Sequence, residues 1–303
     1  MSQKPTLIPL LAVLGSIISL CVGTSFGKSL FPIIGPSGTA AIRVIFAAFI
    51  LVPIFQPWKQ PISLKSMKVV ALYGLVLAVM NSVFYESIQR LPLGIAIAIE
   101  FTGPLTVAIA SSRRVIDFVW IALAAVGLGL LLPWAPGAPG AVALDALGIC
   151  FAFTAAFLWA MYIILGQKMA HLPSGQATAL GVLCAGLVLM PVGIIKAGPH
   201  ILEPQILIGG FFLCLGSSAI PYTLEMWAMK KLPKNTFSIL LSMEPAVGAI
   251  SGMIVLHESL TILQWVAVCS VMVASIGTTM TARPTTAEAA DLNEAVAIPA
   301  DVL

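Results

Sequence analysis

The chain carries very little charge. Asp, Glu, Lys and Arg make up 9% of its 303 residues, whereas about 25% is usual in a soluble domain. A soluble fold of this length would need a far more polar surface to stay dispersed. The net charge of +3 also argues against a nucleic-acid partner, because binding to phosphates depends on a high density of positive charge.

The sequence also lacks the residue clusters of metal sites and catalytic centres. Its three histidines, His171, His200 and His257, are predicted in loops or at helix ends, where none is placed as an intramembrane base. His257-Glu258 begins like the HExxH zinc motif, but the second histidine is absent. Gly-Lys occurs only at residues 27–28, without the preceding glycine of a phosphate loop. We therefore expect no enzyme, no cofactor and no metal.

Gly35-Pro36-Ser37-Gly38 fits the GxSG motif of intramembrane serine proteases and is predicted in a loop between the first two helices. Pro-Ser-Gly recurs at residues 173–175, so helix capping by serine explains both copies.

The cysteines all fall in apolar stretches without metal-site spacing, and we expect them to pack as small apolar residues between helices. They are Cys21, Cys150, Cys184, Cys214 and Cys269.

Apolar residues are abundant: they make up 59% of the chain, and the mean hydropathy is +1.06. The run from Pro5 to Gly27 has no charge, is too long for a signal-peptide core and lacks a small-residue cleavage site. Because a membrane helix needs about 20 largely apolar residues, we predict an all-α integral membrane protein with ten transmembrane helices. The predicted spans are 7–27, 38–56, 69–88, 93–111, 118–134, 146–166, 177–195, 206–228, 236–256 and 261–280.

Lysine and arginine are distributed unevenly among the predicted loops. With the N-terminus in the cytoplasm, 11 of the 15 lie in cytoplasmic loops and ends, three lie outside, and Arg43 lies within a helix. Cytoplasmic loops are enriched in Lys and Arg, so both termini are predicted to be cytoplasmic. Residues 283–303 are alanine-rich and acidic, and we expect a disordered cytoplasmic tail.

The two halves of the chain share spaced features. Pro92 and Pro104 correspond to Pro233 and Pro245 with the same offset of 141, and Lys28 corresponds to Lys168 with an offset of 140. Residues 1–135 and 144–282 are therefore predicted to be two repeats of five helices. Because five is odd, the second repeat enters the membrane from the opposite side, as in many secondary transporters. The alternative is a duplicated scaffold with no transport role.

Charged side chains inside the predicted spans are the candidate functional residues. Each charge near the bilayer centre costs roughly 2.5–3.5 kcal/mol, so we expect these side chains to face one another or a water-filled cavity. Glu100 is the deepest of them, and a purely structural pairing of Arg43 with a glutamate is the alternative. The candidate substrate-binding residues are Arg43, Asn81, Tyr85, Glu86, Glu100, Tyr222, Glu225 and Glu244.

Prolines interrupt the fourth and ninth predicted helices at matched positions. Proline removes the hydrogen bond to the carbonyl four residues earlier, so Pro104 frees the carbonyl of Glu100 and Pro245 frees that of Leu241. An unpaired carbonyl beside a glutamate suits an ammonium group, and broken helices in both halves are typical of a transporter binding site. A kink needed only for packing is the other interpretation.

Five segments carry recognisable motifs: Lys28-Ser-Leu-Phe-Pro32, Leu91-Pro-Leu-Gly-Ile-Ala-Ile-Ala-Ile-Glu-Phe-Thr-Gly-Pro104, Ser111-Ser-Arg-Arg114, Pro221-Tyr-Thr-Leu-Glu225 and Ser242-Met-Glu-Pro-Ala246. With these motifs the chain resembles the EamA family of the drug/metabolite transporter superfamily, over about residues 7 to 280, and within it the threonine/homoserine exporter subgroup. At His257-Glu258 the chain departs from the family, which usually has Gly-Glu there.

The resemblance implies ten helices in two EamA repeats and efflux of amino acids across the bacterial inner membrane. We therefore expect an exporter of threonine, homoserine or similar small neutral amino acids, with a proton as the coupling ion. In this hypothesis Glu100 receives the substrate ammonium and Arg43 its carboxylate. An uptake system or a broad-specificity metabolite permease is the alternative.

Overall fold

The computed structural model describes residues 7–110, 115–131, 144–169, 171–221 and 240–281, together with Leu224, Ala228 and Phe237. In this part of the chain every regular element is a helix. The expected acidic tail, residues 283–303, lies outside the described residues. The prediction of an all-α membrane protein is confirmed, because several helices are long and apolar enough to cross a bilayer.

Five helices have the length and composition of membrane spans. They are α1 (Leu7–Ser29), α2 (Phe31–Phe55), α3 (Leu64–Arg90), α7 (Ala146–Lys168) and α8 (Ser174–Ala197). Shorter apolar helices form much of the rest. They are α4 (Leu93–Glu100), α5 (Thr102–Ala110), α6 (Val115–Leu131), α9 (Pro204–Cys214), α12 (Glu244–Leu256) and α13 (Ile262–Thr281). Two 3₁₀ turns, η1 (Pro57–Lys59) and η2 (Gly198–Leu202), and a π-helical turn, η3 (Leu215–Ala219), complete the described elements.

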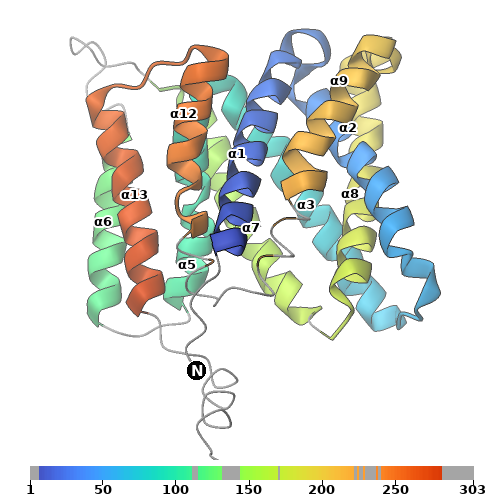
Figure 1. Cartoon of the computed structure of the whole chain (residues 1–303), viewed down its shortest axis with the longest axis horizontal. Helices are drawn as coiled ribbons and strands as arrows, with labels where there is room; N and C mark the ends of the chain where they lie inside the picture. Colours follow the sequence, from blue (N-terminus) through green and yellow to red (C-terminus); the bar gives the residue numbers. More distant parts are fainter. Residues whose placement is uncertain are drawn as a thin grey trace, which may run out of the picture.

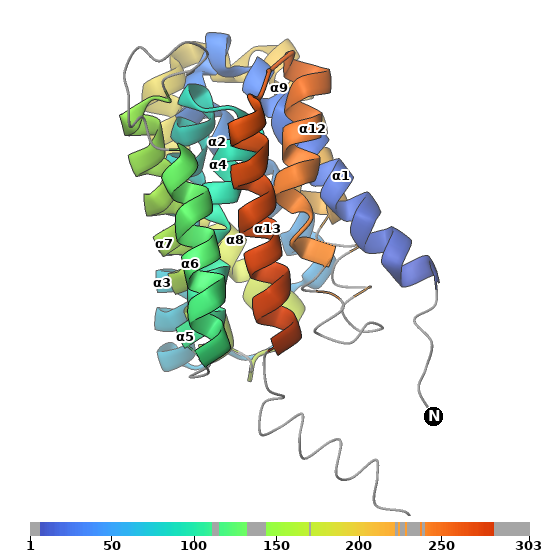
Figure 2. The same cartoon turned by 90° about the vertical axis from the view of Figure 1, so that its left-hand side faces the viewer.

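The helices form one bundle in which neighbours are often far apart in sequence. Figure 1 shows α6 beside α13 at one edge and α2 with α8 at the other, with α1 and α12 between them. Figure 2, turned by 90°, shows that α3 and α7 lie on the face opposite α1 and α12. The helices α3 and α7 pack closely along their length, as do α2 and α8.

Large apolar side chains cover the outside of the bundle. Leu7, Phe49, Phe118 and Ile195 are each more than two-thirds exposed. In water so many exposed apolar groups would promote aggregation, whereas in a bilayer they contact lipid tails. The distribution of these residues agrees with a membrane-embedded bundle.

The structure corrects the predicted loop at residues 35–38. The helix α2 begins at Phe31, directly after the single connecting residue Leu30, and residues 35–38 lie inside it. Gly35 has a φ of 68°, which glycine adopts readily, and this kinks α2 just before Pro36. Capping by Ser37 was also a wrong prediction, since its hydroxyl donates to the Glu86 carboxylate at 3.1 Å.

Small residues allow close approach between helices of the two halves. A side chain at Gly23 of α1 would meet the backbone of Gly216 and Ser217 at 2.7 Å. A side chain at Gly103 of α5 would meet the carbonyl of Ala156 on α7. Such contacts are the usual way in which membrane helices pack, and they place α1 directly against η3, next to the buried polar residues.

Candidate functional site

Arg43 lies near the middle of α2 and is 7% exposed. Its Nε donates a hydrogen bond to Ser218 Oγ at 3.0 Å, and its Nη2 donates to the carbonyl of Ser217 at 3.2 Å. Its Nη1 donates to Tyr85 Oη at 3.3 Å. The guanidinium is thus held in a fixed orientation between α2, α3 and η3. A lysine ammonium on its flexible stem would be less well oriented by the same groups.

The π-helical turn η3 supplies two of these acceptors. A π turn displaces carbonyls from the regular hydrogen-bond ladder, and such turns are frequent at functional sites. Ser217 O accepts from Arg43, and Gly216 O accepts from the hydroxyl of Ser19 on α1 at 2.7 Å. Sequence reasoning missed Ser217 and Ser218. The available signal was Gly216-Ser217-Ser218, three small residues in succession within an apolar span.

Tyr85 is completely buried and is the aromatic neighbour of Arg43. The Arg43 Cζ lies 5.7 Å from the centre of the Tyr85 ring, within cation–π range. Phe31 and Phe84 pack against the same ring, with centroids 5.8 Å and 6.0 Å away. Asn81, one turn earlier on α3, is also buried, but its Nδ2 donates to the carbonyl of Leu77 in its own helix at 2.8 Å.

Glu100 is the last residue of α4 and is 7% exposed. The helix stops there, and α5 starts at Thr102, two residues before Pro104. Within the described part of the chain the Glu100 carboxylate makes no hydrogen bond and no ion pair. The charges of Glu244 and Arg43 both act on it. The structure therefore brings three of the predicted residues, from α2, α4 and α12, into one electrostatic cluster.

Glu244 begins α12, directly before Pro245 and after a turn at Ser242-Met243. A carboxylate at the start of a helix is favoured by the helix dipole. The thiol of Cys21 on α1 contacts the Glu244 carbonyl at 3.8 Å. The interruptions at residue 101 and at residues 242–243 each lie two or three residues before a proline of the matched pair, Pro104 and Pro245.

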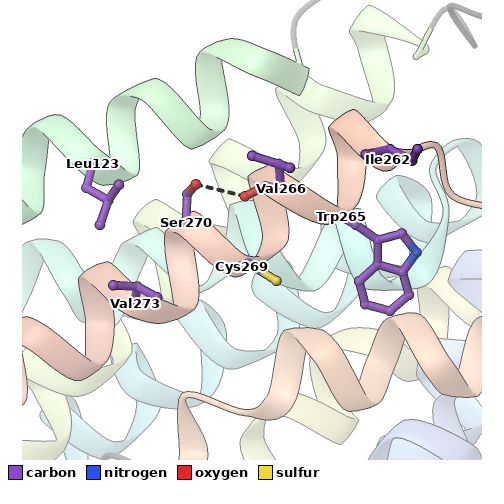
Figure 3. A pocket seen from close by; sticks show the side chains of 7 residues that line it. All are labelled: Leu123, Ile262, Trp265, Val266, Cys269, Ser270 and Val273. Carbon is purple, nitrogen blue, oxygen red and sulfur yellow. Dashed lines mark hydrogen bonds between the residues drawn. The ribbon is translucent and has the colours of Figure 1, made fainter.

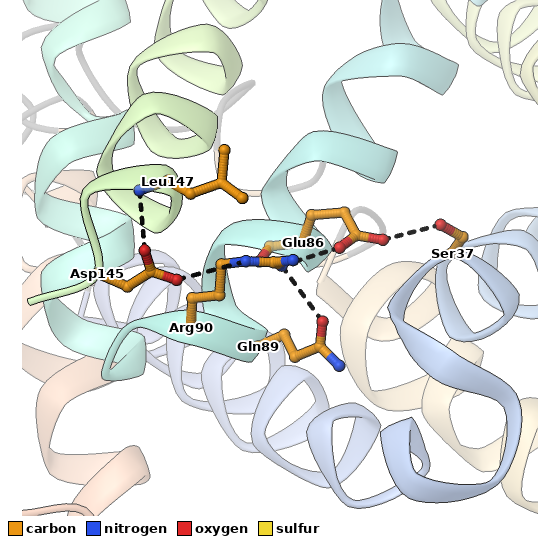
Figure 4. Close-up of polar contacts among 6 residues, drawn as sticks. All are labelled: Ser37, Glu86, Gln89, Arg90, Asp145 and Leu147. Carbon is orange, nitrogen blue, oxygen red and sulfur yellow. Dashed lines mark hydrogen bonds and ion pairs between the residues drawn. The ribbon is translucent and has the colours of Figure 1, made fainter.

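Glu86 belongs to a different cluster, drawn in Figure 4. Its carboxylate pairs with Arg90 at 3.0 Å and accepts from Ser37, while Arg90 reaches Asp145 at 3.5 Å. Asp145 in turn caps α7 by accepting from the backbone of Leu147. This cluster joins the end of α3 to the start of α7. Tyr222 and Glu225, also predicted as site residues, lie outside the described residues.

The burial of Glu100 determines what this cluster can bind. An ionised carboxylate held away from water is costly, and the Glu100 carboxylate makes no hydrogen bond among the described residues. The site therefore favours the arrival of a positive charge at Glu100, as a proton or as an ammonium group. The fixed guanidinium offers planar donors that match a carboxylate. Glu100 and Arg43 together therefore complement a zwitterion, which carries an ammonium and a carboxylate.

A hollow elsewhere on the surface has none of these features. It lies over α13 and is lined by Leu123, Ile262, Trp265, Val266, Cys269, Ser270 and Val273 (Figure 3). Its Ser270 hydroxyl already donates to the carbonyl of Val266 at 2.8 Å. No charged side chain lines it, so it is an apolar surface groove between α6 and α13. Among the described residues no three His, Cys, Asp or Glu side chains gather as a metal site.

An all-helical membrane protein with a charged cluster buried in its centre is the architecture of a transporter. The EamA-like transporter family profile matches residues 146–280. The threonine/homoserine exporter RhtA of Salmonella typhimurium (strain SL1344) is 43% identical over 282 residues, covering 93% of this chain and 94% of the relative. RhtA of Escherichia coli (strain K12) is 42% identical over the same shares. The chain therefore belongs to the EamA-like transporter family.

A solved crystal structure shows the same fold. It aligns with a TM-score of 0.62 at 15% identity and covers 91% of this chain and 97% of its own chain. An uncharacterised transporter of Clostridium kluyveri is 22% identical over 139 residues, 44% of this chain and 43% of that protein.

Proposed function

We propose that the chain exports small neutral amino acids such as threonine and homoserine across the bacterial inner membrane, in exchange for protons. The observation that carries the proposal is the cluster of the buried Arg43 and Glu100 with the half-buried Glu244. The similarity to RhtA over 93% of the chain supports the same substrate class.

Exchange follows from the surroundings of Glu100. Its carboxylate is buried and has no hydrogen-bond partner among the described residues, so a positive charge is favoured beside it. A proton and a substrate ammonium would compete for this place, so the two would not be bound together. Competition of this kind is the simplest basis for antiport. Arg43 would receive the substrate carboxylate.

We further propose ten transmembrane helices in two inverted repeats, residues 1–135 and 144–282. Five long helices and five shorter apolar segments support the count, with α4 and α5 forming one of these segments. The packing of α1 against α12 and of α4 against α7 supports the repeat, because a two-fold relation between the halves would exchange these two contacts. The prolines Pro104 and Pro245 would mark the equivalent breaks.

Both termini would be cytoplasmic. The ends of α3 give two separate groups of loops: Ser66 contacts His171 at one end, and Leu91 contacts Lys28 at the other. The excess of Lys and Arg assigns the first group to the cytoplasm. Reporter fusions near Lys65, Arg113 and Lys231 should read as cytoplasmic, and a periplasmic signal at two of them would reverse the orientation.

The function is tested by transport in liposomes containing the purified protein. Labelled threonine, homoserine and a panel of other amino acids should move against their gradients when a pH gradient is imposed. Cells that overexpress the protein should release the same substrates and resist their toxic excess. Accumulation inside cells, or equal transport of unrelated metabolites, would instead support an uptake system or a broad-specificity permease.

A further inference from the structure

A second ionic cluster joins the ends of three helices. Lys28, in the last turn of α1, pairs with Glu258, which lies in the connection between α12 and α13. Lys28 also donates to the carbonyl of Leu91 at 3.1 Å. The two side chains are 19% and 14% exposed, so water reaches the pair only in part. This pair connects the first half of the chain to the second.

Glu258 also binds the start of α4. Its second carboxylate oxygen accepts a hydrogen bond from the backbone of Leu93 at 2.8 Å. The first amides of a helix have no partner within the helix, and Pro92, which precedes α4, offers no side-chain cap. A carboxylate at this place satisfies the amide and interacts favourably with the helix dipole. One side chain thus holds both α1 and α4.

The position of Glu258 is itself fixed by the end of α12. His257 takes a left-handed conformation with a φ of 56°, and the Glu258 amide donates to the carbonyl of Gly252 at 3.2 Å. A side chain at Gly252 would collide with the Glu258 carboxylate. Glycine at position 252 is therefore required for Glu258 to reach Lys28 and Leu93.

This cluster is mechanically connected to the buried site. The helix α4 starts at the Glu258 contact and ends at Glu100, while α12 starts at Glu244 and ends at Leu256, just before His257. The two helices pack directly on each other, since a side chain at Gly94 would overlap Ala249. They therefore run side by side from the central carboxylates to the Lys28–Glu258 pair.

We infer that Lys28 and Glu258 form the outer gate of the transporter. With the pair formed, α1, α4 and α12 are tied together at the outer end, and the central site is closed toward the periplasm. Breaking the pair releases α1 from the contact that Glu258 makes with α4, and opens the route outward. The inference rests on the proposed function for its role in export and on the proposed orientation for its outer side, whereas the contacts that join α1, α4 and the end of α12 are those of the structure.

Cys21 provides a reporter of this closure. It is completely buried on α1, two turns before Lys28, and contacts the backbone of Glu244. In a background in which the other four cysteines are replaced by alanine, a membrane-impermeant thiol reagent is added to intact cells. Lys28→Gln removes the ion pair and leaves the Glu258–Leu93 contact. Glu258→Gln removes the ion pair and keeps an oxygen that can accept from Leu93.

Both variants should increase the labelling rate of Cys21 from outside about five- to tenfold, the shift expected when one partly buried ion pair no longer favours the closed form. Glu203→Gln is the matched control. Glu203 pairs with His200 three residues away in the same segment, so its loss should leave labelling unchanged.

Unchanged labelling in folded Lys28→Gln and Glu258→Gln would overturn the gate, as would an increase seen only from the cytoplasmic side in inverted vesicles. If Glu258→Gln does not fold, Lys28→Gln decides, because it leaves the cap on α4 intact. Increased labelling in a protein that moves no amino acid would refute the proposed substrate and keep the gate. Normal amino-acid export with unchanged labelling would refute the gate and keep the proposed substrate.

Discussion

The hydroxyl of Tyr85 accepts a hydrogen bond from Arg43 at 3.3 Å, while the guanidinium carbon lies 5.7 Å from the centre of the same ring. One side chain thus restrains the arginine both by its polar tip and by its aromatic ring. Two elements distant in sequence, α2 and α3, are joined at this point. A substitution of Tyr85 can therefore separate the contribution of the hydrogen bond from that of the aromatic ring.

Tyr85→Phe keeps the ring and removes the acceptor. Loss of the partner leaves a buried donor, which costs about 1–3 kcal/mol, so thermal stability should fall and export should decrease by about fivefold or more. Export from cells and unfolding of the purified protein measure the two effects. Tyr73→Phe, twelve residues earlier on α3 and stacked on Tyr162, should export normally. Equal losses in both variants would contradict a specific role for Tyr85.

Arg43→Lys keeps the charge and loses the planar fork. A lysine ammonium cannot reach Ser217, Ser218 and Tyr85 together in the geometry of the arginine. Hydrogen bonds to charged groups are worth about 1.5–3 kcal/mol, so export should fall roughly ten- to hundredfold while the protein still inserts. Membrane content and transport are measured in parallel. Normal transport by Arg43→Lys together with poor expression of Arg43→Ala would make Arg43 a structural residue.

Glu100→Gln removes the charge and keeps the shape of the side chain. The variant should fold, lose substrate binding and lose the dependence of transport on pH, because glutamine cannot exchange a proton for an ammonium. Liposomes with an imposed pH gradient provide the measurement. Glu86→Gln, which affects only the Arg90 cluster, should keep pH-driven transport. If Glu100→Gln still concentrates substrate, the proton site lies elsewhere, with Glu86, Glu225 and Glu244 as the other carboxylates of the predicted spans.

Gly103→Ala tests the packing of α5 against α7. The added methyl group would meet the carbonyl of Ala156, and overpacking of this kind costs about 1–3 kcal/mol, so the melting temperature should fall. Gly129 of α6 has open space where a side chain would be placed. Gly129→Ala should therefore be neutral or stabilising. A similar decrease in both variants would show that helix flexibility, rather than contact, explains the effect.

The sequence predicted the helical membrane fold and the buried charges, since both leave a direct record in residue type. Arg43 and Glu100 were identifiable because a charge inside an apolar span requires a partner. Glu86 was grouped with them although it lies closer to a helix end than Glu100, and its partner Arg90 is one helical turn away. The link from Arg90 to Asp145 of the other half depends on packing between distant segments and could not be predicted.

Ser217 and Ser218 could not be selected in the same way. Their role depends on a π turn, which has no strong residue preference, and on the approach of α1 through Gly23. The start of α2 was misplaced for a related reason. Gly35-Pro36 is typical of a loop, yet the glycine conformation lets the helix continue through a kink.

The π turn makes chain length as important as composition in this part of the protein. A π turn contains about one residue more than an α turn, and one residue corresponds to a rotation of about 100°. Deleting a single residue between Leu215 and Ala219 would restore an ordinary helix and leave the helix beyond it close to its present orientation. The carbonyls of Gly216 and Ser217 would then return to the helical hydrogen-bond ladder and would no longer be placed to accept from Ser19 and Arg43. Substitutions by other small residues are therefore far better tolerated here than any change in residue number.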